Sequence, residues 1–216
     1  MATPASIGNF VSEIVKTRGG PANPTLYQFE ITPPGGAEAG FKSHVERFGF
    51  SFDKEIRFLN YLNNEIQIPG VTFQNSEVRM PYKGLALKMA SAKVYNEMDI
   101  SFYCDTTAMP YKFFRAWLDW VGGTQQFPAF SEKASLVRHG TSCLRYYNEY
   151  TCDMVIRKLE KYGPKKKGEY ASPFAVRLVN AWPFTVSSVP LSSASANGLV
   201  KVTVSLYYEL SVAFNK

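Results

Sequence analysis

The residues whose types could support catalysis or metal binding are few, and their spacing does not bring them together. The 216-residue chain contains two histidines, His44 and His139, and neither has another histidine or a cysteine at ligand spacing. The three cysteines, Cys104, Cys143 and Cys152, are odd in number and form no Cys-x-x-Cys pattern. This argues against a disulfide framework and a zinc site, and it favours a reducing compartment.

Motifs for nucleophilic catalysis and phosphate binding are also missing. No Gly-x-Ser-x-Gly turn occurs, and the pairs Gly19-Gly20 and Gly35-Gly36 lack the residues that complete a phosphate-binding loop. A catalytic triad whose members meet only in space is not tested by spacing alone. We therefore expect a protein that is not an enzyme and that binds no cofactor and no metal ion.

The positive charge is concentrated in one part of the chain. The formal net charge is +6, and residues 131–216 hold twelve basic and six acidic residues, whereas 1–64 and 65–130 are balanced. The excess is densest between residues 133 and 167. Its basic members are Lys133, Arg138, Arg145, Arg157, Lys158, Lys161, Lys165, Lys166 and Lys167. Three interpretations are open: a grip on a phosphate backbone, a solvated loop, or a docking surface for an acidic protein.

Alternating apolar residues predict strands through most of the chain. Such alternation occurs in residues 26–31, 99–104, 151–160 and 174–181, and residues 66–71 resemble a strand that ends in a Pro-Gly turn. Residues 199–213 alternate over about 13 residues, which predicts a strand on the order of 40 Å long. A strand of this length either bends between two sheets or extends to a neighbouring molecule.

Helical spacing is clearest after the strand at 99–104. One apolar stripe, preceded by Pro110 and followed by Gly122-Gly123, predicts an amphipathic helix over residues 111–121. Its expected core residues are Phe113, Phe114, Trp117, Leu118 and Val121. A shorter helix is predicted around residues 7–14, where Ile7, Phe10, Val11 and Ile14 share a face.

Two regions are harder to interpret. In residues 41–64, Phe48, Phe50 and Phe52 alternate as in a strand, whereas Ile56, Leu59 and Leu62 fit a helical face. Residues 84–95 are extended but weakly patterned, which favours a projecting hairpin over a core strand. Together the patterns predict one mainly β domain over 1–216, a two-sheet sandwich or barrel with one flanking amphipathic helix, and with residues 1–21 as an N-terminal arm.

Composition limits the remaining classes. Hydrophobic residues make up 45% of the chain and charged residues 19%, so a packed core is feasible and global disorder is excluded. No apolar run approaches the length of a membrane-spanning helix, and the N-terminus has no pattern of a secretion signal.

The order of several motifs resembles that of the tail tube proteins of T4-type contractile bacteriophages. The resemblance covers most of residues 22–213 and rests on six segments. They are Pro24–Ile31, Ile68-Pro69-Gly70-Val71, the strand and helix from Asp99 to Val121, Tyr150–Leu159, Val179-Asn180-Ala181-Trp182-Pro183, and the final strand with Leu206-Tyr207-Tyr208. Residues 41–64 and 124–146 resemble extra or elongated loops relative to the family pattern.

The resemblance implies a virion structural protein of the phage tail, assembled in the host cytoplasm. Hexameric rings would stack into a tube through which DNA passes at ejection, with sheath, baseplate, initiator and terminator proteins as partners. DNA must slide, so the basic segment is expected outside the lumen, facing outward or between rings. The near-neutral face of the last strand is the expected lumen surface: Lys201, Thr203, Ser205, Tyr207 and Glu209.

Three alternatives remain open. A baseplate tube initiator has the same fold but occurs in one or a few rings. The tube of a phage-related bacterial injection device carries protein cargo. A monomeric nucleic-acid-binding protein would use the basic segment and predicts salt-sensitive DNA binding.

Overall fold

A computed structural model describes residues 22–33, 38–49, 51–79, 84, 86–123, 144–160, 171–189 and 199–214. Nine strands and four helices lie in these ranges. The strands are β1 (Tyr27–Thr32), β2 (Asn63–Ile66), β3 (Val71–Arg79), β4 (Ala86–Tyr95), β5 (Met98–Tyr103), β6 (Cys152–Glu160), β7 (Ala171–Val186), β8 (Lys201–Tyr207) and β9 (Leu210–Phe214). The helices are α2 (Glu38–Glu46), α3 (Phe52–Leu62), α4 (Met109–Val121) and α5 (Tyr147–Tyr150).

Two antiparallel sheets share the long strand β7. In the first, sheet A, β7 lies between β6 and β9, and β1 pairs with the other edge of β6. In the second, sheet B, the C-terminal part of β7 pairs with β8, which is followed by β5 and β2. The positive φ of Asn180 marks the point on β7 where the strand passes from one sheet to the other. These two sheets confirm the predicted fold class.

The regular segment at residues 199–213 bends between the two sheets. It divides at Tyr208 and Glu209, so that β8 belongs to sheet B and β9 to sheet A. This is one of the two outcomes expected for so long a run of alternating residues. The predicted strand at 66–71 has wrong bounds, because β2 ends at Ile66 and residues 67–70 are irregular.

The core lies between the inner faces of the two sheets and continues under the helices. Alternate residues of each strand enter it, as the period of two requires. Its largest fully buried side chains include Phe29 of β1, Phe102 of β5 and Met154 of β6. The rings of Phe29 and Phe102 lie 5.8 Å apart, so the two sheets meet through aromatic contacts.

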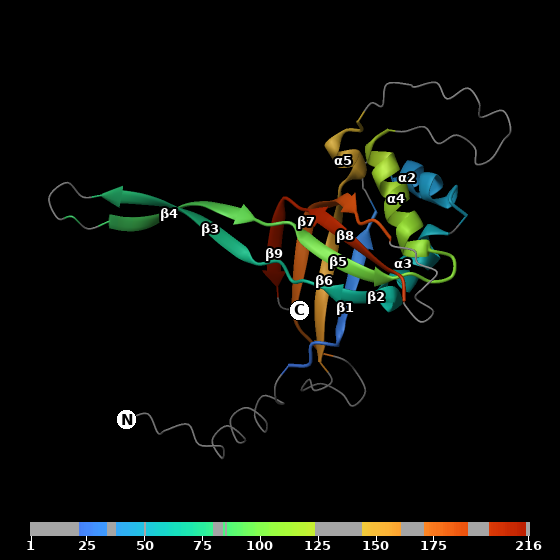
Figure 1. Cartoon of the computed structure of the whole chain (residues 1–216), viewed down its shortest axis with the longest axis horizontal. Coiled ribbons are helices and arrows are strands. Elements are labelled where there is room, and N and C mark those ends of the chain that lie inside the picture. Colours follow the sequence, from blue (N-terminus) through green and yellow to red (C-terminus); the bar gives the residue numbers. More distant parts are fainter. Residues whose placement is uncertain are drawn as a thin grey trace, which may run out of the picture.

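Three helices cover one end of the sheets (Figure 1). The predicted helix is present as α4. The ring centre of Phe114 in α4 lies 5.2 Å from that of Phe102 in sheet B. Residues 41–64 are not an elongated loop, because they contain most of α2 and all of α3. The strand interpretation of the Phe48–Phe52 alternation is therefore wrong, and the helical one is right: Gly49 has a φ of 91° and separates two helices.

The hairpin formed by β3 and β4 projects from the side of the body that lies opposite the helices (Figure 1). The body here means all the described elements except these two strands. β3 and β4 pair with each other and with no other described strand, which confirms the projecting hairpin expected at 84–95. At its base Tyr95 packs against Tyr208 of the body, with ring centres 5.9 Å apart. The expected helix at 7–14 and residues 124–143 lie outside the described residues.

Candidate assembly surfaces

The described histidine and cysteines lie in structural positions. His44 is buried, and its Nε2 lies 3.1 Å from the carbonyl oxygen of Ala116, so α2 is joined to α4. Cys152 is a buried core residue, and burial raises the pKa of its thiol well above the usual value. Cys104 is only partly buried and follows the end of β5. Among the described residues, no group of three His, Cys, Asp or Glu side chains could hold a metal ion.

The predicted helix residues differ in burial. Phe113, Phe114 and Trp117 are fully buried, whereas Leu118 and Val121 are partly buried at the edge of the stripe. The indole nitrogen of Trp117 donates to the carbonyl oxygen of Tyr150 at 2.9 Å, which joins α4 to α5. A second indole, that of Trp120, donates to the carbonyl oxygen of Glu149. Both indole N–H groups are thus bonded within the chain, as buried ring donors require.

The polar residues proposed for the lumen cover part of the outer face of sheet B. Thr203 and Ser205 of β8 lie opposite Ser101 and Asp99 of β5 in register. Their side chains are bonded across the strands: the Ser101 and Thr203 hydroxyls lie 3.1 Å apart, and the Ser205 hydroxyl donates to Asp99 at 2.6 Å. Lys201 lies over the ring of Tyr103. This surface is hydroxyl-rich and carries one carboxylate and one ammonium group on the paired strands.

The other two lumen candidates have different surroundings. Tyr207 stacks on Phe184 of β7, with ring centres 3.9 Å apart, so this end of the face is aromatic. Glu209 lies beyond the end of β8, in the two-residue break before β9, and accepts a hydrogen bond from the side-chain amide of Asn180 at 2.6 Å. The expectation that all five residues follow one strand is therefore wrong for Glu209.

Three members of the predicted basic patch are described, and they do not form one surface. The guanidinium of Arg145 lies 3.5 Å over the ring of Trp120, beside the helices. Arg157 is on the outer face of sheet A, where it pairs with Glu30 of β1. The other six members, from Lys133 to Lys167, lie outside the described residues.

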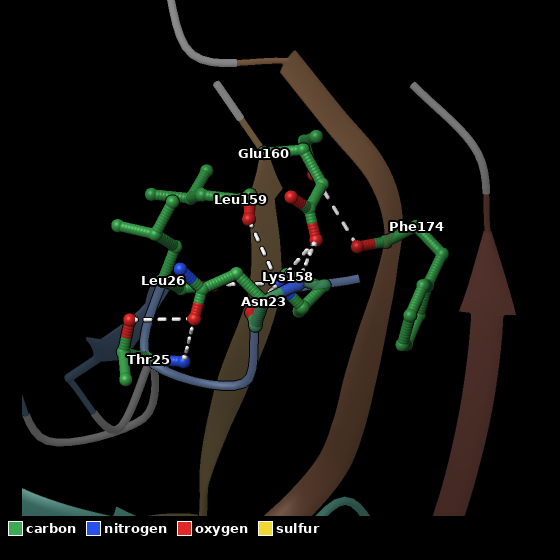
Figure 2. Close-up of polar contacts among 8 residues, drawn as sticks. Asn23, Thr25, Leu26, Lys158, Leu159, Glu160 and Phe174 are labelled. Carbon is green, nitrogen blue, oxygen red and sulfur yellow. Dashed lines mark hydrogen bonds and ion pairs between the residues drawn. The ribbon is translucent and has the colours of Figure 1, made fainter. Parts of the chain in front are cut away.

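Lys158 is the member whose position differs most from the expectation. Its side chain is only 11% exposed. Its Nζ donates to Glu160 Oε1 at 2.7 Å, to the carbonyl oxygens of Leu159 at 2.8 Å and Leu26 at 3.3 Å, and to the carbonyl oxygen of Asn23 (Figure 2). An outward docking role for Lys158 is therefore wrong, because its ammonium group is used to join β6 to the segment before β1.

The hairpin presents two chemically different faces. Residues that alternate along β3, together with their register partners on β4, place charged Glu77, Lys88 and Lys93 on one face, which also carries the exposed Phe73. The opposite face, named here the hairpin apolar face, is exposed over its distal half. Its apolar residues are Val78, Leu87, Met89, Ala92 and Val94, and the same face also carries Thr72, Gln74 and Ser76 of β3. Sequence reasoning predicted the projection but missed this face, because a bulge at Ser91 shifts the alternation on β4.

Several strand edges of the body carry no described partner strand. β9 pairs only with β7, and β2 pairs only with β5. The edge of β1 is partly covered, because the backbone N–H of Phe29 donates to the side chain of Asn60 at 2.9 Å. Unpaired edges of this kind can pair with strands of another chain.

The described helices include none that is long and apolar enough to cross a membrane.

Comparisons with known proteins agree with this architecture. The family model of phage tail tube proteins matches residues 22–212. Among solved structures, a chain of the PVC sheath–tube complex, an extracellular contractile injection system in its extended state, is similar with a TM-score of 0.52 and 11% identity, over 98% of this chain and 99% of that one. A chain of the anti-feeding prophage baseplate has a TM-score of 0.47 and 14% identity, over 71% and 80%. A comparison with curated protein sequences finds no match. Because the family model spans most of the sequence, the chain belongs to the phage tail tube protein family.

Proposed function

We propose that this protein is a subunit of the inner tail tube of a contractile-tailed bacteriophage, in which hexameric rings stack around a DNA channel. The family match and the two-sheet fold support a tube role. Under this proposal the subunit acts in the phage tail after assembly in the host cytoplasm. Its role is structural, so no catalysis and no cofactor are required of it.

The observation that carries the proposal is the exposed hairpin. A two-stranded hairpin is marginally stable by itself in water, and this one holds Met89 at 56% exposure and Leu87 at 45%. Both lie on the hairpin apolar face, for which the described chain supplies no cover. A second copy of the chain would bury that face, and it would shield the distal part of the hairpin from water.

Ring closure has a separate structural basis. The free edges of β9 and β2 belong to different sheets, so neighbouring subunits could continue a sheet around a ring without covering the hairpin. Under sixfold symmetry, such edge-to-edge pairing would enclose a continuous wall.

The outer face of sheet B is the proposed lumen surface. Its serine and threonine hydroxyls are bonded to neighbours across β5 and β8, and Asp99 offsets the charge of Lys201. Such a surface offers DNA little net attraction, because affinity for phosphates grows with the number of cations that replace counterions. DNA would therefore pass without specific binding.

The basic residues that remain candidates for docking sheath or baseplate proteins are those outside the described ranges. We propose an outward or inter-ring position for them: Lys133, Arg138, Lys161, Lys165, Lys166 and Lys167. Arg145 and Arg157 already face an aromatic ring and a carboxylate within the chain, so they contribute less to an acidic partner.

The test is negative-stain electron microscopy of the purified protein and of two hairpin variants. Met89→Asp places a carboxylate on the hairpin apolar face, and Asn75→Asp places the same group on the charged face. Hollow tubes are expected for the unmodified chain and for Asn75→Asp. Met89→Asp should form no tubes, whereas single rings closed through the edges of β9 and β2 do not require its side chain. Dispersed unmodified protein, at any concentration tested, would contradict the proposal.

The lumen assignment is tested separately. Thr203→Lys adds a cation to the outer face of sheet B, and Gln28→Lys adds one to the outer face of sheet A. Provided that both variants form tubes, DNA should be retained in salt-sensitive fashion only by Thr203→Lys tubes, because that cation contacts phosphate. Equal DNA retention by both variants would contradict the assignment of sheet B to the lumen.

The tube of a bacterial injection device is the second candidate, because the structural match to the PVC chain extends over 99% of that chain. The cargo of purified particles separates the two: DNA indicates a phage tail, and protein indicates an injection device. A baseplate initiator is separated by copy number, since it would occur in one or a few rings.

A further inference from the structure

The methionines in the described ranges differ sharply in exposure. Three of them are core residues and are at most 3% exposed: Met98, Met109 and Met154. The fourth, Met89 of β4, is 56% exposed. Its register partner on β3 is the small residue Ser76, and β3 and β4 pair with no other described strand. In the single subunit the Met89 side chain is therefore open to water and to small solutes.

An exposed thioether reacts with hydroperoxides. The sulfur takes one oxygen atom from the peroxide: an S–O bond forms as the O–O bond breaks, the sulfur loses two electrons and becomes a sulfoxide, and hydrogen peroxide is reduced to water. The reaction needs no neighbouring base, so access of the oxidant to the sulfur decides the rate. A methionine in the core reacts only when its surroundings open, which costs free energy.

The described cysteines compete poorly for the same oxidant. Cys152 is buried, and Cys104 is only partly exposed. Burial raises the pKa of both thiols, and the carboxylate of Asp105 adds to the rise in the pKa of Cys104. Since the thiolate is the reactive form of cysteine, both side chains react slowly. Among the sulfur-bearing side chains of the described ranges, Met89 is thus the one that a peroxide reaches first.

Oxidation at this position changes the chemistry of the hairpin apolar face. Met89 shares that face with Leu87 and Val78, which are register partners of each other. A sulfoxide converts the flexible apolar side chain into a polar one with a strong hydrogen-bond acceptor. In the free subunit water satisfies this acceptor, so the fold of the body loses nothing. Beneath a second copy of the chain the acceptor loses its water, which weakens the contact.

We propose that Met89 is an oxidation site for hydroperoxides, and that its sulfoxide weakens the association of subunits through the hairpin apolar face. The oxidation site is a property of the single subunit, whereas the effect on association rests on the proposed function. Free subunits are then sensitive to oxidant, and assembled subunits are protected because the face is covered. Reduction of the sulfoxide by a thiol-dependent reductase restores the apolar side chain.

Mass spectrometry of peroxide-treated protein tests the site. Trypsin cleavage after Lys88 and Lys93 places Met89 in a peptide that contains no other methionine. In dilute protein treated with limiting hydrogen peroxide, this peptide should gain one oxygen at least about tenfold faster than the peptides with the three core methionines. Equal rates would overturn the proposed site. In assembled tubes the same peptide should react more slowly, and an unchanged rate there would overturn the effect on association.

Sedimentation before and after peroxide treatment tests the effect on association. Treatment should weaken association of the unmodified chain by about tenfold or more, and a methionine sulfoxide reductase with a thiol should reverse the loss. Met89→Leu retains an apolar side chain without sulfur. Whatever the association constant of this variant, peroxide should leave it unchanged. An equal loss in Met89→Leu would assign the sensitivity to other residues and overturn the proposal.

Two further measurements separate the possible failures. Circular dichroism should be the same before and after treatment, because an oxidised hairpin leaves the body folded, and a lost signal would overturn the assignment of the effect to the hairpin apolar face. Absence of association in untreated, unmodified protein would contradict the proposed function and the effect on association together. Faster oxidation of the Met89 peptide would still support the oxidation site in that case.

Discussion

The body and the β3–β4 hairpin are both antiparallel β-structure, but they treat their apolar side chains in opposite ways. In β5 and β8 the inward residues, among them Ile100 and Val204, are at most 1% exposed. In the hairpin, Met89 is more than half exposed, although its strand is longer than either. The local backbone is the same, so the difference comes from the layers above: the body has a second sheet and helices, and the hairpin has only itself.

This comparison divides the stability of the subunit from its assembly. Side chains of the body contribute to the free energy of unfolding of one chain. Side chains on the hairpin apolar face contribute when another chain covers them. Substitutions in the two regions should therefore change different measurements.

The largest effect on folding is expected in the body. Phe102→Ala removes a fully buried ring that contacts Phe29 of sheet A and Phe114 of α4. The free energy of unfolding should fall by about 3–5 kcal/mol, as measured by urea denaturation of dispersed protein. A loss below ~1 kcal/mol would mean that the sheets do not pack as described.

A smaller loss is expected at the joint between β6 and the segment before β1. Lys158→Met keeps most of the apolar stem but leaves the carbonyl oxygens of Leu26 and Leu159 without this donor. The cost should be about 1–3 kcal/mol by the same denaturation measurement. Arg177→Met is a suitable control, because Arg177 pairs with Asp153 on a more exposed surface and its loss should cost less.

The contact between α2 and α4 should depend on pH. Burial lowers the pKa of His44, helped by Arg47 and Arg145 and opposed by the Ala116 carbonyl and Asp119. Below the ordinary histidine pKa the unfolded chain therefore takes up a proton that the folded chain resists. The free energy of unfolding should decrease as the pH falls through this range, and His44→Gln should reduce that decrease. An unchanged pH profile in His44→Gln would assign the decrease to other groups.

The smallest effect on folding is expected in the hairpin. Leu87→Ala should change the unfolding of dispersed subunits by less than about 0.5 kcal/mol, because the side chain is already exposed. Sedimentation of the same variant should nevertheless show weaker association. A large loss of subunit stability would show that the hairpin is covered within its own chain, and the comparison with the body would fail.

The sequence predicts the parts of the fold whose signals are local. The stripe around Phe113 and Trp117 places α4 correctly, and the weak pattern at 84–95 indicates the hairpin. Residues 41–64 resist interpretation because Phe48, partly buried in the turn after α2, and Phe52, fully buried at the start of α3, lie on either side of Gly49, so their spacing mimics a strand. The strand predicted at 174–181 continues as β7 to Val186, past Trp182 and Pro183. A proline after a strand pattern more often indicates that the strand has ended.

The candidate surfaces are less predictable, because they depend on partners distant in sequence. A count of charges treats Arg157 and Lys158 as equivalent neighbours. In the fold they lie on opposite faces of β6: one pairs with Glu30 on the outer face, and the other bonds to the backbone before β1. The sequence of residues 133–167 does not indicate that Glu30 and the backbone before β1 are the partners. These partners follow from the register of β1 against β6.

That register also sets an order for folding. Asn23 and Glu160, which are hydrogen-bonded, are 137 residues apart, so sheet A cannot close during synthesis until most of the chain has left the ribosome. The hairpin needs only residues 71–95 and can form long before. A nascent subunit thus exposes its hairpin apolar face before its body has folded. When many copies are translated close together, premature association of these exposed hairpins would be most harmful. Slow pairing of β3 with β4, or a chaperone bound to the hairpin, would increase the yield of folded subunits.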